Sequence, residues 1–207
     1  MMIKFTKDEI RNILISIIVI SILFTINTTQ KIGWTNKEII NILIITLILF
    51  SISLIAKIYS QKYLARKYHY HIEYKIWGYG IIFAVVTMLL NIFIITPGYF
   101  KYGLYDRIAT DEEKAKIAVT GSAINIILAV IFLMALIILK YSIMTASIIK
   151  LAMLIGFYIN TYMAVFNLIP FMTLDGMKIV EYDMKMWIAP MTISAILLVI
   201  TFTSYII

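Results

Sequence analysis

Apolar residues run along this chain in six long stretches, and short polar segments separate them. Each stretch is close to or above the ~20 residues that a helix needs to cross a lipid bilayer. The pattern therefore predicts an all-α polytopic membrane protein, in which residues 1–207 form a single membrane domain. The six predicted transmembrane helices cover residues 10–28, 39–58, 79–96, 117–139, 143–170 and 188–207.

The fifth apolar stretch is longer than one span needs, and Pro170 lies at its end. Proline has no backbone N–H and interrupts a helix, and an interrupted helix is tolerated at membrane depth where it lines a cavity. We therefore expect this helix to break or tilt between residues 160 and 170.

Residues 68–77, "YHYHIEYKIW", alternate strictly between polar and apolar side chains. This period of two indicates a short β-strand after the second helix. It would place His69, His71, Glu73 and Lys75 on one side and the apolar residues on the other.

The connection over residues 96–118 is expected to be a polar hairpin or loop. Pro97 and Gly98 are a turn signal within it. Thr110 and Glu113 have the spacing of a capping box at the start of the fourth helix.

Composition supports a membrane location and limits the chemistry. The chain is 62% hydrophobic with a mean hydropathy of +0.97, and its net charge of +7 comes from 18 Lys and Arg against 11 acids. The bases lie between the apolar stretches, which favours contact with anionic membrane lipids and gives no basic arm for nucleic acid. With six spans, the distribution of bases favours both termini on the inner side of a multi-pass cell-membrane protein. Cysteine is absent, which excludes disulfides, thiolate metal sites and cysteine nucleophiles.

A carboxylate at the end of an apolar segment is the main candidate for chemistry. Asp175 follows "FNLIPFMTL", and a charge in such a position is costly unless it meets a partner, a metal or water. Together with Asn167, Pro170 and Gly176 it forms the pattern N-x-x-P-x-x-x-x-D-G.

This pattern resembles that of the site-2-protease family of intramembrane zinc metallopeptidases, in particular an archaeal branch. The segment 160–190 resembles the part of that family that supplies the third zinc ligand, which implies that Asp175 occupies a ligand position. Residues 119–129, "VTGSAINIILA", resemble the family's glycine-proline and asparagine helix, with Ser122 in place of the proline and Asn125 retained. Residues 94–100, "IITPGYF", resemble a hairpin of the archaeal branch.

The family's other zinc ligands are histidines of an H-E-x-x-H helix, whose glutamate is the general base. Counted back from the strand, that motif falls on "KIYSQ", so that Lys57, Ile58 and Gln61 stand where the two histidines and the glutamate are expected. Protonated lysine has no lone pair, isoleucine cannot move a proton and glutamine is a poor zinc ligand. The resemblance therefore implies a degenerate member without zinc, in which Lys57 and Asp175 form an ion pair in place of the metal.

The strand at residues 68–77 offers one other candidate metal site. His69, His71 and Glu73 on one face of a strand have the residue types of a three-ligand zinc site. The resemblance places the ligands on the second helix instead, and we interpret this strand face as solvated.

Four asparagines lie within the predicted spans: Asn91, Asn125, Asn160 and Asn167. Amides in hydrocarbon need partners, so we expect them to hydrogen-bond across helices. The resemblance also makes Asn125, Asn167, Pro170 and Gly176 candidates for binding a substrate or partner.

Three functions are compatible with the sequence. The leading hypothesis is a non-enzymatic binder or regulator of membrane proteins, without a cofactor, whose strand adds to an extended peptide of a transmembrane client. The first alternative is an active intramembrane metallopeptidase with a rearranged zinc site. The second is a small transporter that uses the interrupted fifth helix and the buried asparagines.

Overall fold

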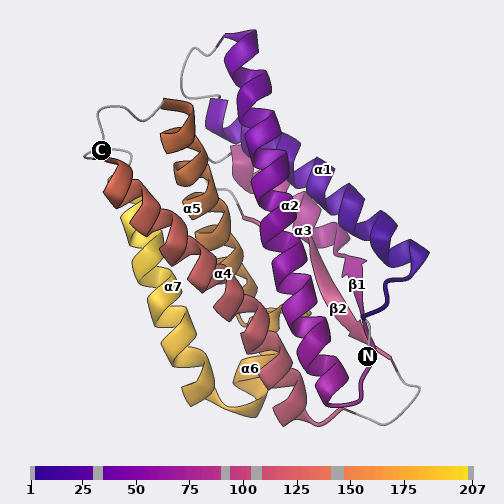
Figure 1. Ribbon diagram of the computed structural model, residues 1–207. Coiled ribbons are helices and arrows are strands. Elements are labelled where there is room, and N and C mark those ends of the chain that lie inside the picture. The colour runs from indigo at the N-terminus through magenta and orange to yellow at the C-terminus, as the bar shows by residue number, and fades with distance from the viewer. Residues whose placement is uncertain (1–2, 30–34, 90–93, 104–108, 141–146, 205–207) are drawn as a thin grey trace.

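The computed structural model describes residues 3–29, 35–89, 94–103, 109–140 and 147–204. Most of these residues lie in helices that run side by side, and a two-stranded sheet lies against one end of the bundle (Figure 1). The elements in chain order are α1 (Lys7–Thr29), α2 (Asn36–Lys67), β1 (Ile72–Ile76), α3 (Gly78–Leu89), β2 (Gly98–Tyr102), α4 (Asp111–Lys140), α5 (Ser147–Leu168), α6 (Asp175–Tyr182) and α7 (Met184–Ser204).

Five of these helices are long and apolar enough to cross a membrane. They are Lys7–Thr29, Asn36–Lys67, Asp111–Leu139, Ser147–Leu168 and Met184–Phe202. One face of each is left for lipid: on α2, for example, Ile44, Ile48, Ile52 and Ile55 are all exposed, at the spacing of a single helix face. The polytopic membrane class is thus supported by five spans.

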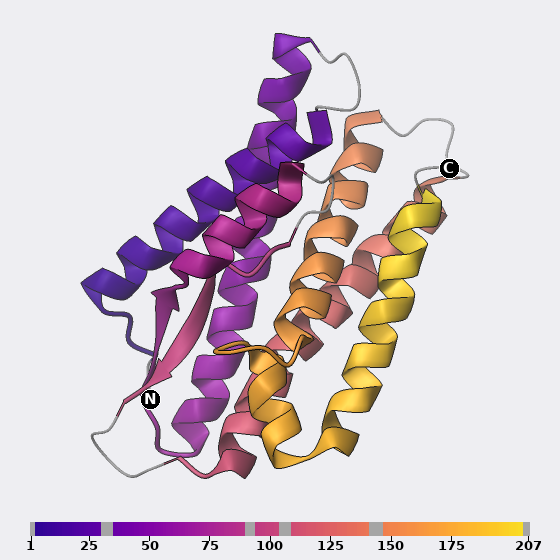
Figure 2. The same ribbon diagram turned by 180° about the vertical axis from the view of Figure 1, so that it is seen from behind.

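The third of the six predicted spans, residues 79–96, is not confirmed. Its described helix α3 has 12 residues, which reach about 18 Å at the rise of an α-helix, against a hydrocarbon core of about 30 Å. The chain then returns as β2 along β1 (Figure 2). Apolar composition alone could not distinguish this short helix from a span.

Residues 68–77 contain the predicted strand, but the strand is shorter than predicted. β1 begins at Ile72, and Ile72 and Tyr74 point into the core as the alternation requires. His69 lies outside the strand, with a φ of 64°, so that it does not share a strand face with His71 and Glu73.

The partner of β1 was missed in the sequence. Residues 98–102 form β2, which pairs antiparallel with β1 so that Tyr74 lies opposite Phe100. The predicted turn at Pro97 and Gly98 is therefore the start of a strand. A side chain at Gly98 would lie 2.4 Å from the ring of Tyr74, so the glycine is needed for the close approach of the strands.

Of two predictions about helix ends, one is confirmed and the other is not. The capping box before α4 is confirmed, because Thr110 Oγ1 accepts a hydrogen bond from the Glu113 amide and the Glu113 carboxylate accepts one from the Thr110 amide. The predicted break in the fifth helix is not seen between residues 160 and 168. α5 is continuous through Asn160 and ends at Leu168, two residues before Pro170.

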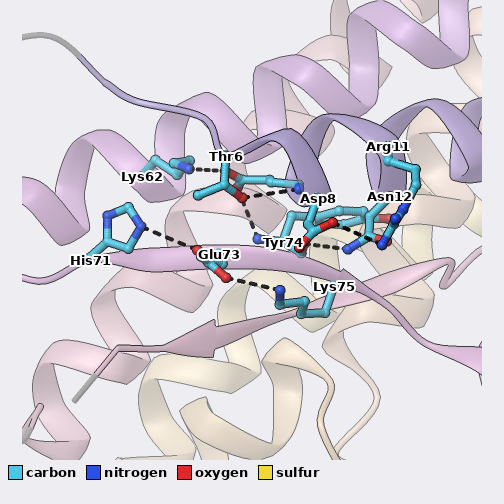
Figure 3. Close-up of polar contacts among 10 residues, drawn as sticks. Thr6, Asp8, Arg11, Asn12, Lys62, His71, Glu73, Tyr74 and Lys75 are labelled. Carbon is cyan, nitrogen blue, oxygen red and sulfur yellow. Dashed lines mark hydrogen bonds and ion pairs between the residues drawn. The ribbon is translucent and has the colours of Figure 1, made fainter. Parts of the chain in front are cut away.

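The sheet is held against the bundle by a buried ion pair. Glu9 of α1 is fully buried and pairs with Lys62 of α2. Its other carboxylate oxygen accepts a hydrogen bond from the backbone amide of Tyr74 at 3.0 Å, and Asn12 donates to the carbonyl of Tyr74 (Figure 3). The Tyr74 hydroxyl reaches Ser16 of α1, and burial raises the pKa of this phenol. These contacts fix β1 between α1 and β2.

Five spans place the first and last described residues at opposite ends of the bundle (Figure 1). The end with the N-terminus also holds β1, β2, α6 and the starts of α4 and α7. Most basic residues gather there, and within the described ranges the far end has only Lys37, Lys140 and Lys150. Because the cytoplasmic side of membrane proteins carries the excess of Lys and Arg, the N-terminal end is expected to face the cytoplasm. The earlier expectation of both termini inside depended on six spans and does not fit this arrangement.

This sidedness can be measured cleanly because the chain has no cysteine. In intact cells, a membrane-impermeant maleimide should label Lys140→Cys and a cysteine appended after Ile207. Lys67→Cys should react only after the membrane is permeabilised. If the appended cysteine is protected like Lys67→Cys, the number of spans is even and the five-span arrangement is wrong.

Candidate functional site

Asp175 lies at the first position of α6, buried where α6 meets α2 and α4. Its residue exposure is 4%, and the element bounds place it directly after the loop that follows Pro170. A carboxylate in the first turn of a helix is favoured by the free amides and the helix dipole. That contribution alone does not offset the burial of a charge, so side-chain partners are required.

Both oxygens of Asp175 are engaged by side chains. The ammonium of Lys57 lies 3.0 Å from Oδ2, and Gln61 Nε2 donates to the same oxygen at 3.0 Å. On the other side, Lys178 Nζ lies 3.4 Å from Oδ1. The expected ion pair between Lys57 and Asp175 is therefore present, and it is part of a four-residue cluster.

The cluster follows from simple helical spacing. Lys57 and Gln61 are four residues apart on α2 and so lie on one face, while Lys178 is one turn after Asp175 on α6. Ile58, which stands at the position of the motif's glutamate, points away from the cluster into the main apolar core with 1% exposure.

Gln61 joins the cluster to α4. Its Nε2 also donates to the backbone carbonyl of Ala118 at 3.3 Å. A side chain at Gly121 would lie 2.5 Å from Gln61 Cδ, so this glycine makes the space that the amide fills. Gly121 thus permits the close approach of α2 and α4.

Two positive charges surround one negative charge at this site. Burial alone would raise the pKa of Asp175, but the charges of Lys57 and Lys178, with the hydrogen bonds from Lys57 and Gln61, outweigh it and lower the pKa. The carboxylate is therefore ionised at neutral pH. Because this pKa is below the unfolded value, the stabilisation is present above that value and is lost as the pH falls through the folded pKa.

Gly176 has a packing role in the structure. A Cβ there would lie 2.0 Å from the carbonyl oxygen of Leu168, the last residue of α5. The Trp187 indole donates to that same oxygen at 2.6 Å. The glycine thus allows α6 to lie directly against the end of α5, which sets the position of Asp175.

The remaining candidate residues are the asparagines of the predicted spans and Pro170. Asn167 and Asn160 donate to carbonyls of their own helix, those of Met163 and Gly156, and among the described residues neither amide has a hydrogen-bond partner on another helix. Asn125 is fully buried on α4, and neither its Nδ2 nor its Oδ1 has a partner among the described residues. Pro170 is exposed after the end of α5. Asn91 lies outside the described residues.

The donor set around Asp175 does not fit a zinc ion. Zinc sites in proteins need three or four ligands with lone pairs, and a lysine ammonium has none. A metal at Asp175 would have to displace Lys57 and Gln61 from Oδ2. In the part of the chain that the structure describes, no three His, Cys, Asp or Glu side chains gather as a metal-binding group. His69, His71 and Glu73 therefore do not form the zinc site considered above, although His71 and Glu73 lie 3.8 Å apart.

Sequence reasoning missed Lys178 and the contact of Gln61 with α4. The spacing of Asp175 and Lys178 within one helix is a signal that could have revealed the former. The latter depends on which helices pack together, and a single sequence does not contain that information.

Comparison with known proteins supports a metalloprotease-like relationship. The chain is 28% identical over 185 residues to a protein of Methanocaldococcus jannaschii named "Putative zinc metalloprotease", and the match covers 89% of each chain. No protein-family model matches the chain. No solved structure matches it either.

A double-mutant cycle tests the ion pair. Lys57→Met should lower the free energy of unfolding by roughly 3 kcal/mol, because it leaves the Asp175 carboxylate buried with weaker compensation. Asp175→Asn added to it should recover much of that loss, since no buried charge at position 175 then remains.

Thermal unfolding in detergent of the wild type, both single variants and the double variant measures the coupling. Losses that simply add would show that the two side chains do not interact.

Proposed function

We propose that this protein is a metalloprotease-related membrane protein that binds a segment of another membrane protein without cleaving it. The observation that carries the proposal is the occupation of both Asp175 oxygens by Lys57, Gln61 and Lys178. In place of a metal, the chain supplies an ammonium and an amide. The relationship to a zinc metalloprotease supports a scaffold suited to such segments.

The edge of the sheet offers a place for an extended segment. In an antiparallel pair, the residues opposite each other alternate between hydrogen-bonded and non-hydrogen-bonded pairs. The bonds from Gly103 to His71 and from Trp77 to Pro97 fix this alternation. The backbone groups of Gly98, Phe100 and Tyr102 therefore point away from β1.

The two edges of the sheet differ in availability. On β1, the amide and carbonyl of Tyr74 are bonded to Glu9 and Asn12. On β2, the outward backbone groups have no partner among the described residues. An added strand would therefore pair with β2, and not with the strand at 68–77 that the sequence suggested.

The open edge ends beside the Asp175 cluster. β2 is the strand on the side of α5 and α6 (Figure 2), and the Lys178 ammonium lies 5.7 Å from the centre of the Tyr102 ring. A segment paired with β2 would thus pass beside the cluster. Backbone hydrogen bonds would supply affinity, as in other cases of strand addition.

The alternative function is an active metallopeptidase with a rearranged zinc site, which the name of the relative favours. Zinc content separates the two functions. After a chelator wash and zinc readdition, the detergent-purified protein should hold no more zinc than its Asp175→Ala variant, because the donors do not form a site.

A positive control for the zinc measurement lies on the same helix face. The double variant Lys57→His, Gln61→His places two imidazoles four residues apart beside Asp175 and should gain about one zinc per chain. About one zinc in the wild type, lost in Asp175→Ala, would contradict the proposal and make a protease assay the next step.

Photocrosslinking tests the open strand edge. A photoreactive amino acid at Lys101 of β2, which is exposed, should give discrete protein adducts in native membranes. The matched control is the same group at Lys75 of β1, where α1 covers the outer edge. Equal adducts at both positions, or none at Lys101, would argue against binding at β2.

A further inference from the structure

A cavity separate from the Asp175 cluster lies at the N-terminal end of the bundle. It has a volume of about 490 Å³, within the usual range of small-molecule sites. Three segments line this open cavity: the extended N-terminal residues, the last turns of α2 and the link from α2 to β1. Its lining is Ile3, Lys4, Lys62, Arg66, His69, Tyr70, His71 and Ile72.

The lining is strongly basic. It contains three Lys or Arg and two His, and no Asp or Glu belongs to it in the described part of the chain. Lys62 is neutralised by Glu9 (Figure 3). Lys4 and Arg66 have no ion-pair partner among the described residues, so at least two positive charges face the cavity without compensation.

The guanidinium of Arg66 is not needed to cap its helix. The last carbonyls of α2 accept backbone hydrogen bonds from Tyr68, His69 and Tyr70. The bonds from Tyr70 to Ala65 and from His69 to Arg66 form a Schellman motif, which closes a helix without side-chain help. Arg66 is therefore available to a ligand.

The same motif places a histidine where glycine is usual. His69 occupies the left-handed position of the motif with a φ of 64°, and a non-glycine residue there is strained. Its imidazole is exposed and lines the cavity. Strained residues cluster at binding sites because the surrounding structure maintains them for function, and this is a second, independent feature of the cavity.

We propose that this cavity binds a phosphate-bearing anion, held by Lys4, Arg66 and the imidazoles of His69 and His71. Arginine and imidazole donors suit phosphate oxygens. The cavity lies where the apolar part of α1 begins and that of α2 has ended, which is the depth of lipid headgroups. The phosphate belongs either to an anionic lipid or to a soluble compound, and the two sources share this chemistry.

Thermal unfolding of the detergent-purified full chain tests the site. The midpoint should rise saturably with inorganic phosphate, compared with chloride at equal ionic strength, or with short-chain phosphatidylglycerol, compared with phosphatidylcholine. A rise with phosphate indicates that a soluble compound can fill the site, and a rise with the anionic lipid alone indicates a headgroup. No saturable rise with either probe would overturn the proposal.

Three variants connect the effect to the cavity. Arg66→Gln should weaken binding about tenfold, because it removes a charge-assisted contact. His69→Gly should also weaken binding, yet raise the unliganded midpoint by relieving the left-handed strain; this opposite change separates lost binding from lost folding. Lys67→Gln, the matched control, makes the same charge change on the adjacent exposed residue, outside the lining, and should bind like the wild type.

Two results with these variants would contradict the proposed anion site. Equal affinity in the wild type, Arg66→Gln and His69→Gly would show that the cavity does not hold the anion. A loss in Lys67→Gln as large as that in Arg66→Gln would show a diffuse surface charge effect and would equally overturn the proposal.

Discussion

The arrangement of this protein depends on how a carboxylate is satisfied inside an apolar bundle. Asp175 is buried, and an isolated buried charge would cost several kcal/mol. The chain meets this requirement with Lys57 and Gln61 from α2 and Lys178 from α6. Since Gln61 also bonds to α4, one charged group constrains the relative positions of three helices.

A second buried ion pair uses the same principle at the other side of α2. Lys57 faces α6, while Lys62, five residues later and about 140° around the helix, faces Glu9 of α1. The Glu9 carboxylate also receives the backbone amide of Tyr74. α2 thus connects the Asp175 cluster with the sheet, and the covered edge of β1 leaves β2 as the available edge.

The cluster shows how a buried carboxylate is satisfied in a chain that has a metalloprotease-like relative. A metal ion contributes positive charge that offsets a buried carboxylate, and the Lys57 ammonium contributes positive charge at the same atom. Under the proposed function, the ammonium meets the electrostatic requirement of the buried carboxylate with a group that has no lone pair for zinc. The packing around Gly176 and Gly121 holds Asp175 and Gln61 in place without reference to a metal.

The sequence by itself determined the membrane class, the capping box at Thr110, the strand character near Ile72 and the need of the Asp175 carboxylate for a partner. Each of these follows from short-range patterns: long apolar runs, local spacing, or a charge where none is expected. Tertiary structure decided what those patterns leave open. Whether residues 79–96 cross the membrane depends on the return of the chain as β2, and the partner of β1 depends on a contact between distant segments. Lys178, the contact of Gln61 with Ala118 and the basic cavity at Arg66 and His69 likewise arise because separate helices and loops meet in space, and periodicity along one chain does not record which faces will pack together.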